Sequence, residues 1–213
     1  MHTGVLARES PLPDVGIGSA IFAGDPACLT LGLLTGLRTV RPRQPLLIVD
    51  GANAFDPFLV ADLARKFGLL PEALLDEIRI SRVFTCHQLE ALLRGRLGMA
   101  LRQFRARAVY FSGLLDPLLD EDVPRGEAAR ILRLIPPILR RLTASGVMTL
   151  AACPEPLSLP GREEFFPWIC RTAGWVFQVR REETAVEITS TKPSAASWTW
   201  EPQIGLLAPR RWG

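Results

Sequence analysis

The sequence predicts a single α/β domain with a mostly parallel β-sheet, flanking helices and antiparallel strands near the C-terminus. Continuous apolar runs such as Pro45–Asp50 and Ala106–Ser112 are typical of parallel strands that are buried on both faces. Segments with helical spacing alternate with these runs up to Cys153. Beyond Cys153, short runs with polar turns between them favour antiparallel strands at one edge. With 213 residues, 48% of them hydrophobic, the chain can bury one core.

The first half of the chain alternates strands with helices. A strand predicted at Ser19–Ala23 ends at Gly24-Asp25-Pro26, and leucines at helical spacing predict a helix over Cys28–Arg38. Thr85 is a suitable N-cap for a later helix. The other predicted elements are the strand Pro45–Asp50, the helices Asp56–Phe67 and Pro71–Ile78, the strand Ile80–Phe84 and the helix Thr85–Leu101.

The second half begins with the strand Ala106–Ser112 and an acidic loop at Leu114–Pro124. A long helix is predicted over Arg125–Ala144, with a kink at Pro136-Pro137, because an interior proline removes a hydrogen bond and costs about 3 kcal/mol. The remaining predicted strands are Val147–Ala152, Trp175–Arg180, Ala185–Thr189 and Ser197–Glu201.

The organisation along the chain is an N-terminal arm, one core domain and a short tail. Residues 1–16 form the polar arm, residues 17–208 the core, and residues 209–213 (PRRWG) the tail. Trp212 and the arginines beside it could dock onto a partner or pack back on the domain. We find no internal repeat.

Composition narrows the classes of protein. The four cysteines form no CxxC pair, which argues against a zinc site. Met1–Pro13 carries charges and prolines rather than a signal peptide, and no apolar run is long enough to span a bilayer. The sequence therefore predicts a cytoplasmic protein that does not bind membranes. Apart from Lys66 and Lys192 every basic residue is arginine, which fits either phosphate binding or GC-rich codon usage.

The turn after the first strand is where a phosphate-binding loop would lie. Such loops read GxxxxGK[ST], and their lysine reaches the β- and γ-phosphates. Gly24–Leu31 reads GDPACLTL, so one register puts Thr30 at the lysine position, and the other puts Cys28 at the second glycine and Thr30 at the hydroxyl position. Asp25 adds negative charge where a triphosphate would sit, and Pro26 removes an amide donor. The chain therefore lacks a working phosphate loop.

Four segments of the chain are, in order, similar to segments of one known protein core. Two of them are LLIVDGANAFDP at Leu46–Pro57 and ISRVFTCHQL at Ile80–Leu89, which includes the pair His87-Gln88. The others are Ala108–Ser112, followed by RGEAAR at Arg125–Arg130, and Val147–Cys153. Their order and spacing resemble the RecA/RadA recombinase superfamily over roughly residues 16–208, closest to the archaeal and eukaryotic-type recombinases and their paralogues. The resemblance implies a RecA-like core.

The resemblance also implies that the residues needed for ATP hydrolysis are lost. The position of the family's catalytic glutamate is taken by Ala52, and that of its Walker B aspartate by Ser112. Asp50 matches the first acidic residue of the same motif, which is not the residue that activates water. Phosphoryl transfer depends on positioning and charge neutralisation, so these losses together remove most of it. We expect a degenerate nucleotide site at Gly24, Cys28, Thr30, Asp50, Ala52 and Ser112, with no catalytic residue, no metal and no tightly bound cofactor; weak ATP binding stays open.

Two loops fall where the resemblance implies contacts with single-stranded DNA. Leu114–Gly126 is acidic and has only Arg125, and a second loop at residues 154–167 holds Arg162 among glutamates. Aromatic residues near the second loop could stack on bases or pack on the core. Arg102 and Arg105 belong to the densest basic cluster, which could face a nucleic acid, an acidic partner or only solvent. These four arginines are the candidate contacts with nucleic acid or a partner.

The leading hypothesis is an inactive recombinase-like accessory protein, a pseudo-ATPase, that acts in DNA repair or recombination. It would work through protein contacts, for example with a recombinase or a component of a repair polymerase, and DNA contacts stay open. The alternative is a regulatory module that binds a nucleotide or nucleic acid without hydrolysis. A third hypothesis is a diverged enzyme that uses the crevice at the strand ends, where Asp25, Cys28 and Asp50 are the candidate groups.

Overall fold

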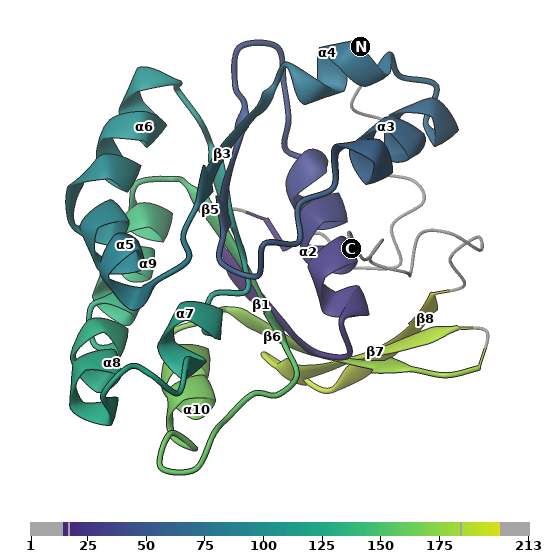
Figure 1. The fold of residues 1–213 in the computed structure, drawn as a ribbon. Helices are drawn as coiled ribbons and strands as arrows, with labels where there is room; N and C mark the ends of the chain where they lie inside the picture. The colour runs from purple at the N-terminus through teal and green to yellow at the C-terminus, as the bar shows by residue number, and fades with distance from the viewer. Residues whose placement is uncertain (1–14, 17, 184, 201–213) are drawn as a thin grey trace.

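The computed structural model describes residues 15–16, 18–183 and 185–200 (Figure 1). Within them, eight strands form one sheet in the order β3-β2-β4-β5-β1-β6-β7-β8. The strands are β1 (Ser19–Gly24), β2 (Leu46–Asp50), β3 (Ile78–Arg82), β4 (Ala108–Ser112), β5 (Met148–Pro154), β6 (Trp175–Arg181), β7 (Val186–Lys192) and β8 (Ala196–Trp200). The predicted tail 209–213 and most of the predicted arm 1–16 lie outside the described residues.

Ten helical segments surround the sheet in the described part of the chain. They are α2 (Ala27–Leu37), α3 (Pro57–Lys66), α4 (Pro71–Leu75), α5 (Cys86–Ala91), the π-helical turn η1 (Leu92–Arg96), α6 (Leu97–Gln103), α7 (Asp116–Leu119), α8 (Arg125–Leu132), α9 (Ile135–Ala144) and α10 (Phe165–Cys170). No helix in this part is both long and apolar enough to cross a membrane.

Strand pairing confirms the predicted α/β class. All pairs from β3 to β6 are parallel, including β1 with both β5 and β6. The antiparallel pairs are β6 with β7 and β7 with β8, at one edge. The antiparallel extension is therefore confirmed, although its first strand, β6, joins the sheet by parallel pairing with β1.

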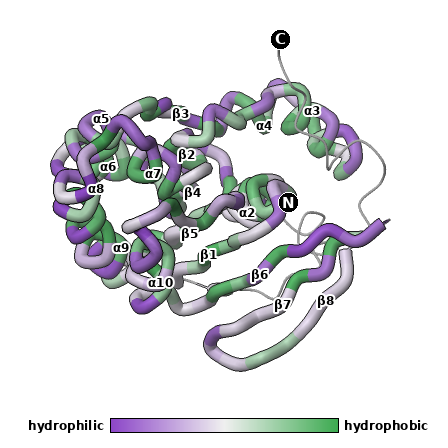
Figure 2. Tube along the Cα trace, turned by 60° about the horizontal axis from the view of Figure 1, so that its bottom comes forward, coloured by the Kyte–Doolittle hydropathy of each residue, from purple (hydrophilic) through white to green (hydrophobic). Residues whose placement is uncertain are grey.

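Helices cover both faces of the central parallel strands, so β1, β2, β4 and β5 are almost entirely buried, whereas the edge strand β3 is exposed after Ile78. In β1, Ile21 and Ala23 pack on the face covered by the helices from α5 onward. Ala20 and Phe22 pack on the opposite face, toward α2, α3 and α4. Figure 2 shows the hydrophobic strands inside these two layers. Beyond β1 the second core continues through Phe177, whose ring stacks on Phe22 with centroids 5.1 Å apart.

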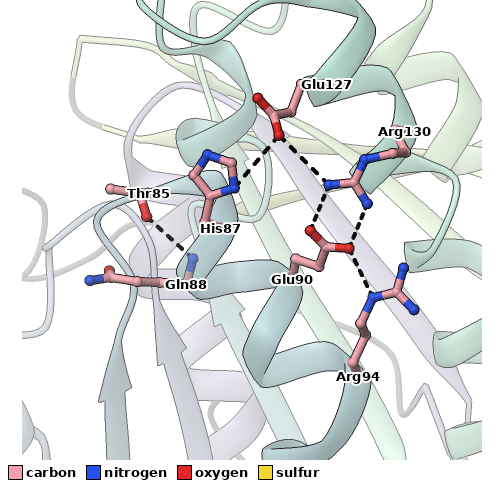
Figure 3. Close-up of polar contacts among 7 residues, drawn as sticks. All are labelled: Thr85, His87, Gln88, Glu90, Arg94, Glu127 and Arg130. Carbon is pink, nitrogen blue, oxygen red and sulfur yellow. Dashed lines mark hydrogen bonds and ion pairs between the residues drawn. The ribbon is translucent and has the colours of Figure 1, made fainter.

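Two helix starts follow ordinary capping chemistry. The Asp56 carboxylate accepts a hydrogen bond from the Phe58 amide at 2.8 Å, and proline opens α3. The Thr85 hydroxyl accepts from the Gln88 amide at 3.2 Å, which confirms Thr85 as the N-cap (Figure 3). The helix predicted over Thr85–Leu101 runs on to Gln103 and contains the π-helical turn η1.

The long helix predicted over Arg125–Ala144 is wrong, because the chain forms two helices there. α8 ends at Leu132 and α9 begins at Ile135. Pro136 and Pro137 consequently lie in the first turn of α9, where their missing N–H groups cost no helical hydrogen bond. The prolines start a helix instead of kinking one.

Other boundaries also differ from the prediction. The segment Leu114–Pro124 was predicted to be a loop but contains the short helix α7, and Phe165–Cys170 forms α10 where only loop aromatics were expected. β3 begins at Ile78, two residues early, which shortens the helix predicted over Pro71–Ile78 to Pro71–Leu75. These elements are short, and short elements leave little periodicity to read.

Helix α2 lies very close to the sheet because two of its residues lack side chains. A Cβ on Gly32 would come within 2.5 Å of the Tyr110 ring, and a Cβ on Gly36 within 2.9 Å of Leu46. The Tyr110 ring is fixed, since it is 2% exposed and its hydroxyl donates to the Leu29 carbonyl at 2.8 Å.

We predict that Gly32→Ala lowers the free energy of unfolding by about 1–3 kcal/mol, because the new methyl group overpacks the core. The matched control is Gly126→Ala in α8, where a Cβ meets no atom within 4 Å. That change should be neutral or stabilise by about 0.5 kcal/mol. Urea denaturation of both variants measures the difference, and equal stabilities would contradict the close packing of α2.

Candidate functional site

The candidate site lies at the carboxyl edge of the parallel strands, the usual place for ligands in such sheets. Gly24 ends β1, Asp50 ends β2 and Ser112 ends β4, so the structure brings these three predicted positions to one edge. Ala52 lies in the loop after Asp50. Cys28 and Thr30 lie on α2, which starts at the same edge.

The connection from β1 to α2 is only Asp25 and Pro26. Gly24 makes this turn possible, since its φ is +114° and a Cβ there would collide with the Val179 carbonyl of β6. The Gly24 carbonyl in turn accepts from the Glu155 amide after β5 at 2.9 Å. The backbone is thus held on two sides, and no wide loop encircles a phosphate position.

Asp25 occupies the place of an anion at the start of α2. Its carboxylate accepts from the Ala27 amide at 2.8 Å and forms an ion pair with Arg181 of β6 at 3.1 Å. A helix N-terminus attracts negative charge through its free N–H groups and its dipole. Here the protein's own carboxylate satisfies that preference and would repel a bound triphosphate.

The backbone amides of this turn are also engaged within the protein. The Asp25 amide donates to the Val179 carbonyl at 2.9 Å, and the Cys28 amide donates to the Asp25 carbonyl at 2.8 Å. The Leu29 amide donates to the Pro26 carbonyl at 3.0 Å. The Ala27 amide donates to the Asp25 carboxylate, and Pro26 has no N–H group. Every backbone N–H between Asp25 and Leu29 therefore has an acceptor within the protein.

Asp50 serves the loop that follows it. Its side chain is fully buried and accepts from the amides of Ala54 and Phe55, both at 3.1 Å. The Arg82 guanidinium lies 3.8 Å from the second carboxylate oxygen. This carboxylate therefore closes the β2–α3 loop, and its hydrogen bonds point to the backbone rather than to a reacting water.

The positions of Ala52 and Ser112 are packed against each other. The Ser112 carbonyl accepts from the amides of Gly51 and Ala52 at 2.7 and 3.0 Å. Gly113 has φ of +67°, and a Cβ on it would come within 2.6 Å of the Ala52 amide. The backbones of the two loops therefore contact each other directly at these positions. No group of three or more metal-binding side chains occurs anywhere in the described residues.

The two thiols near this edge are poor nucleophiles. Cys28 and Cys153 are both buried, and burial raises the pKa of each thiol far above its ordinary value. The thiolate, which is the reactive form, is therefore disfavoured at neutral pH. Thr30 lines a small cavity of about 30 Å³ with Phe55, Tyr110 and Ser112, too small for a nucleotide.

Asp116 is a member of this site that the sequence did not single out. It opens α7, and burial raises the pKa of its carboxyl to about 6, with the charge of Asp50 adding to the rise. The sequence showed it only as one acid of an acidic loop. The sequence signal for its burial is the group of apolar residues around it, Leu114, Leu115 and Leu118, all of which are buried.

The four candidate arginines do not form one surface. Arg102 and Arg105 precede β4 and lie at the amino edge of the sheet, whereas Arg125, the first residue of α8, and Arg162, in the loop after β5, lie at the carboxyl edge. Arg162 is only 6% exposed and donates to the carbonyls of Leu118, Asp120 and Val123. Arg162 therefore holds the loop after β5 against the segment from α7 to α8 and is not available on the surface.

Arg125 also connects these two segments, from the exposed side. Its guanidinium donates to the Gly161 carbonyl and pairs with Glu164 at 2.8 Å. The loops expected to contact single-stranded DNA are thus tied to each other, and Phe165 of the second loop is fully buried in the core. Packing, not base stacking, is the role of this aromatic residue.

A separate polar cluster joins α5 to α8 (Figure 3). Glu90 accepts from Arg130 at 2.6 Å and from Arg94 at 2.8 Å, and these arginines lower the pKa of its carboxyl to about 2. His87 lies 3.7 Å from Glu127 and is 63% exposed. The cluster holds helices together, and it places no nucleophile beside His87.

Comparison with known proteins gives no family for the chain. No family model matches it, and no curated protein matches it. The family and its function therefore remain proposals that depend on the residues described above.

The pKa of Asp116 gives a prediction about stability and pH. A carboxyl with a raised pKa in the folded state makes the protein less stable as pH rises from about 4 to about 6. Asp116→Asn removes this penalty, so it should stabilise by about 1–2 kcal/mol at pH 7.5 and by less at pH 4. Urea denaturation at both pH values measures the gain. Asp122→Asn, at an exposed acid in the turn after α7, is the control and should show no such trend.

Proposed function

We propose that this chain is a RecA-like protein that has lost ATP hydrolysis and acts in DNA repair or recombination by contacting other proteins. The RecA-like part of the proposal is supported by the order of the four similar segments. They fall on β2, β3, β4 and β5 and the residues after them, which are neighbouring parallel strands whose carboxyl ends share one edge with the β1–α2 turn.

The loss of hydrolysis is supported most strongly by one observation. Asp25 sits at the start of α2 with its carboxylate bound to the Ala27 amide and paired with Arg181. A triphosphate bound there would displace both contacts and meet a like charge. The absence of a lysine before Lys66, and the internal use of Asp50 and Ser112, remove the remaining parts of the chemistry.

The two competing hypotheses have less support. A nucleotide-binding regulatory module needs free donors at the α2 N-terminus, and these are engaged. A diverged enzyme needs a reactive group in the crevice, and the best candidate there is Asp116, with a pKa of about 6 but no nucleophile of lowered pKa near it. Contacts with a recombinase or with a repair polymerase component remain the form of action that we favour.

The biochemical test is an ATPase assay with magnesium and single-stranded DNA. We expect no turnover above background, because no group neutralises or positions a γ-phosphate. Turnover above about a few per minute that Asp116→Asn abolishes would overturn the inactive assignment.

The cellular test follows survival after DNA damage in a strain that lacks the gene. We expect the deletion to lower survival or the frequency of recombination, and both the wild-type chain and Asp116→Asn to restore it, since no catalytic chemistry is required. Unchanged survival and recombination in the deletion strain would contradict the repair role.

A further inference from the structure

A groove of about 710 Å³ runs between the segment η1–α6 and helix α9. Both helices cover the same face of the sheet, far from the β1–α2 turn (Figure 1). The groove is thus separate from the degenerate nucleotide site. Its lining comes from Leu93, Arg94, Gly95, Leu97, Gly98, Met99, Leu101, Arg102, Ile138, Arg141, Leu142 and Ser145.

The floor of this groove is apolar and roomy. Leu97 and Leu101 from α6 and Ile138 and Leu142 from α9 line it as largely buried side chains, and Met99 is 55% exposed. Gly95 and Gly98 leave space on the α6 side, because a Cβ on Gly95 would meet no atom within 4 Å and one on Gly98 would meet only Arg102. Exposed methionine and flexible apolar surface are typical of protein-binding grooves.

The rim of the groove is strongly basic. Three arginines, Arg94, Arg102 and Arg141, are among the described residues that line it, and no acidic residue is among them. Arg94 is partly neutralised by Glu90, which it shares with Arg130. Arg102 and Arg141 form no ion pair with any described residue, although both line the groove. The groove therefore combines an apolar floor with two uncompensated charges.

We infer that this groove binds an amphipathic, acidic helical segment of a partner protein. An apolar stripe at helical spacing would fill the floor between α6 and α9, and flanking carboxylates would pair with Arg102 and Arg141. A nucleic acid fits less well, because no aromatic side chain of the described residues lines the groove for bases to stack on. The inference rests on the proposed function only in that both require a protein partner.

The probe is a fluorescein-labelled peptide of about 18 residues with leucines at i, i+3, i+4 and i+7 and glutamates beside them. We expect it to bind the full chain with a Kd on the order of 10 μM at about 50 mM salt, measured by fluorescence anisotropy. The same peptide with lysines in place of the glutamates should bind at least about tenfold more weakly. Equal binding of the two peptides, or no binding at about 100 μM, would overturn the inference.

Two double variants with the same change in net charge locate the site. Arg102→Glu with Arg141→Glu should weaken binding at least about tenfold, whereas Arg133→Glu with Arg140→Glu, on the same helical layer but outside the groove, should change it less than about twofold. Equal loss in both double variants would mean general attraction to a basic face and would contradict the groove.

A third variant separates loss of binding from loss of folding. Gly98→Leu fills the groove while replacing a helical glycine by a good helix former, so its melting temperature should not fall. We expect it to abolish peptide binding. Unchanged peptide affinity in this variant would overturn the inference. Preferential, groove-dependent binding of a single-stranded thymidine oligonucleotide over the acidic peptide would also overturn it, in favour of nucleic acid.

The outcomes remain distinguishable from those of the proposed function. Peptide binding without ATP turnover supports both, and peptide binding with ATP turnover keeps the groove but contradicts the inactive assignment. Failure of the peptide with no ATP turnover removes the groove and leaves the inactive assignment standing.

Discussion

The carboxylate of Asp25 at the start of α2 is the interaction on which the carboxyl edge of this sheet depends. It accepts from the Ala27 amide, pairs with Arg181 of β6, and so joins β1, α2 and β6 across a turn of two residues. A turn this short lets α2 lie against β4 through Gly32. The same carboxylate occupies the anion position that a helix N-terminus creates. The Asp25 carboxylate thus both holds the short β1–α2 turn together and removes the phosphate site.

The rest of that edge is interlocked in a similar way. Asp50 accepts from amides of the loop after β2, the Ser112 carbonyl accepts from Gly51 and Ala52, and Arg162 donates to three carbonyls in α7 and in the loop after it. A buried guanidinium with several acceptors is costly to disturb, because removing them would leave its charge unpaired. The carboxylates and backbone groups at this edge therefore bond to the protein itself and not to a ligand. Free polar and apolar surface lies instead on the outer side of α6 and α9, where the basic groove is.

Much of the fold could be predicted from the sequence, and the reason is burial. Strands such as β2 are covered on both faces, so Leu46–Val49 are all apolar and buried, and Thr85 has a capping side chain in the right place. The kink predicted at Pro136 and Pro137 is wrong because proline is also favoured in the first turn of a helix, and the sequence pattern does not distinguish the two. Arg162 and Asp116 look like surface residues in a sequence, and only the packing of distant parts of the chain makes Arg162 buried and Asp116 half-buried. The groove could not be predicted, since it joins helices about 40 residues apart in the chain.

The central claim is that no nucleotide binds at the β1–α2 turn because its donors are already used. Backbone amide chemical shifts of the isotope-labelled chain, recorded by NMR during a titration with magnesium ATP to about 5 mM, test it directly. The account predicts that the amide signals of Asp25, Ala27, Cys28 and Leu29 do not move. Saturable shifts confined to these amides would show that a phosphate reaches the helix start, and would contradict the account.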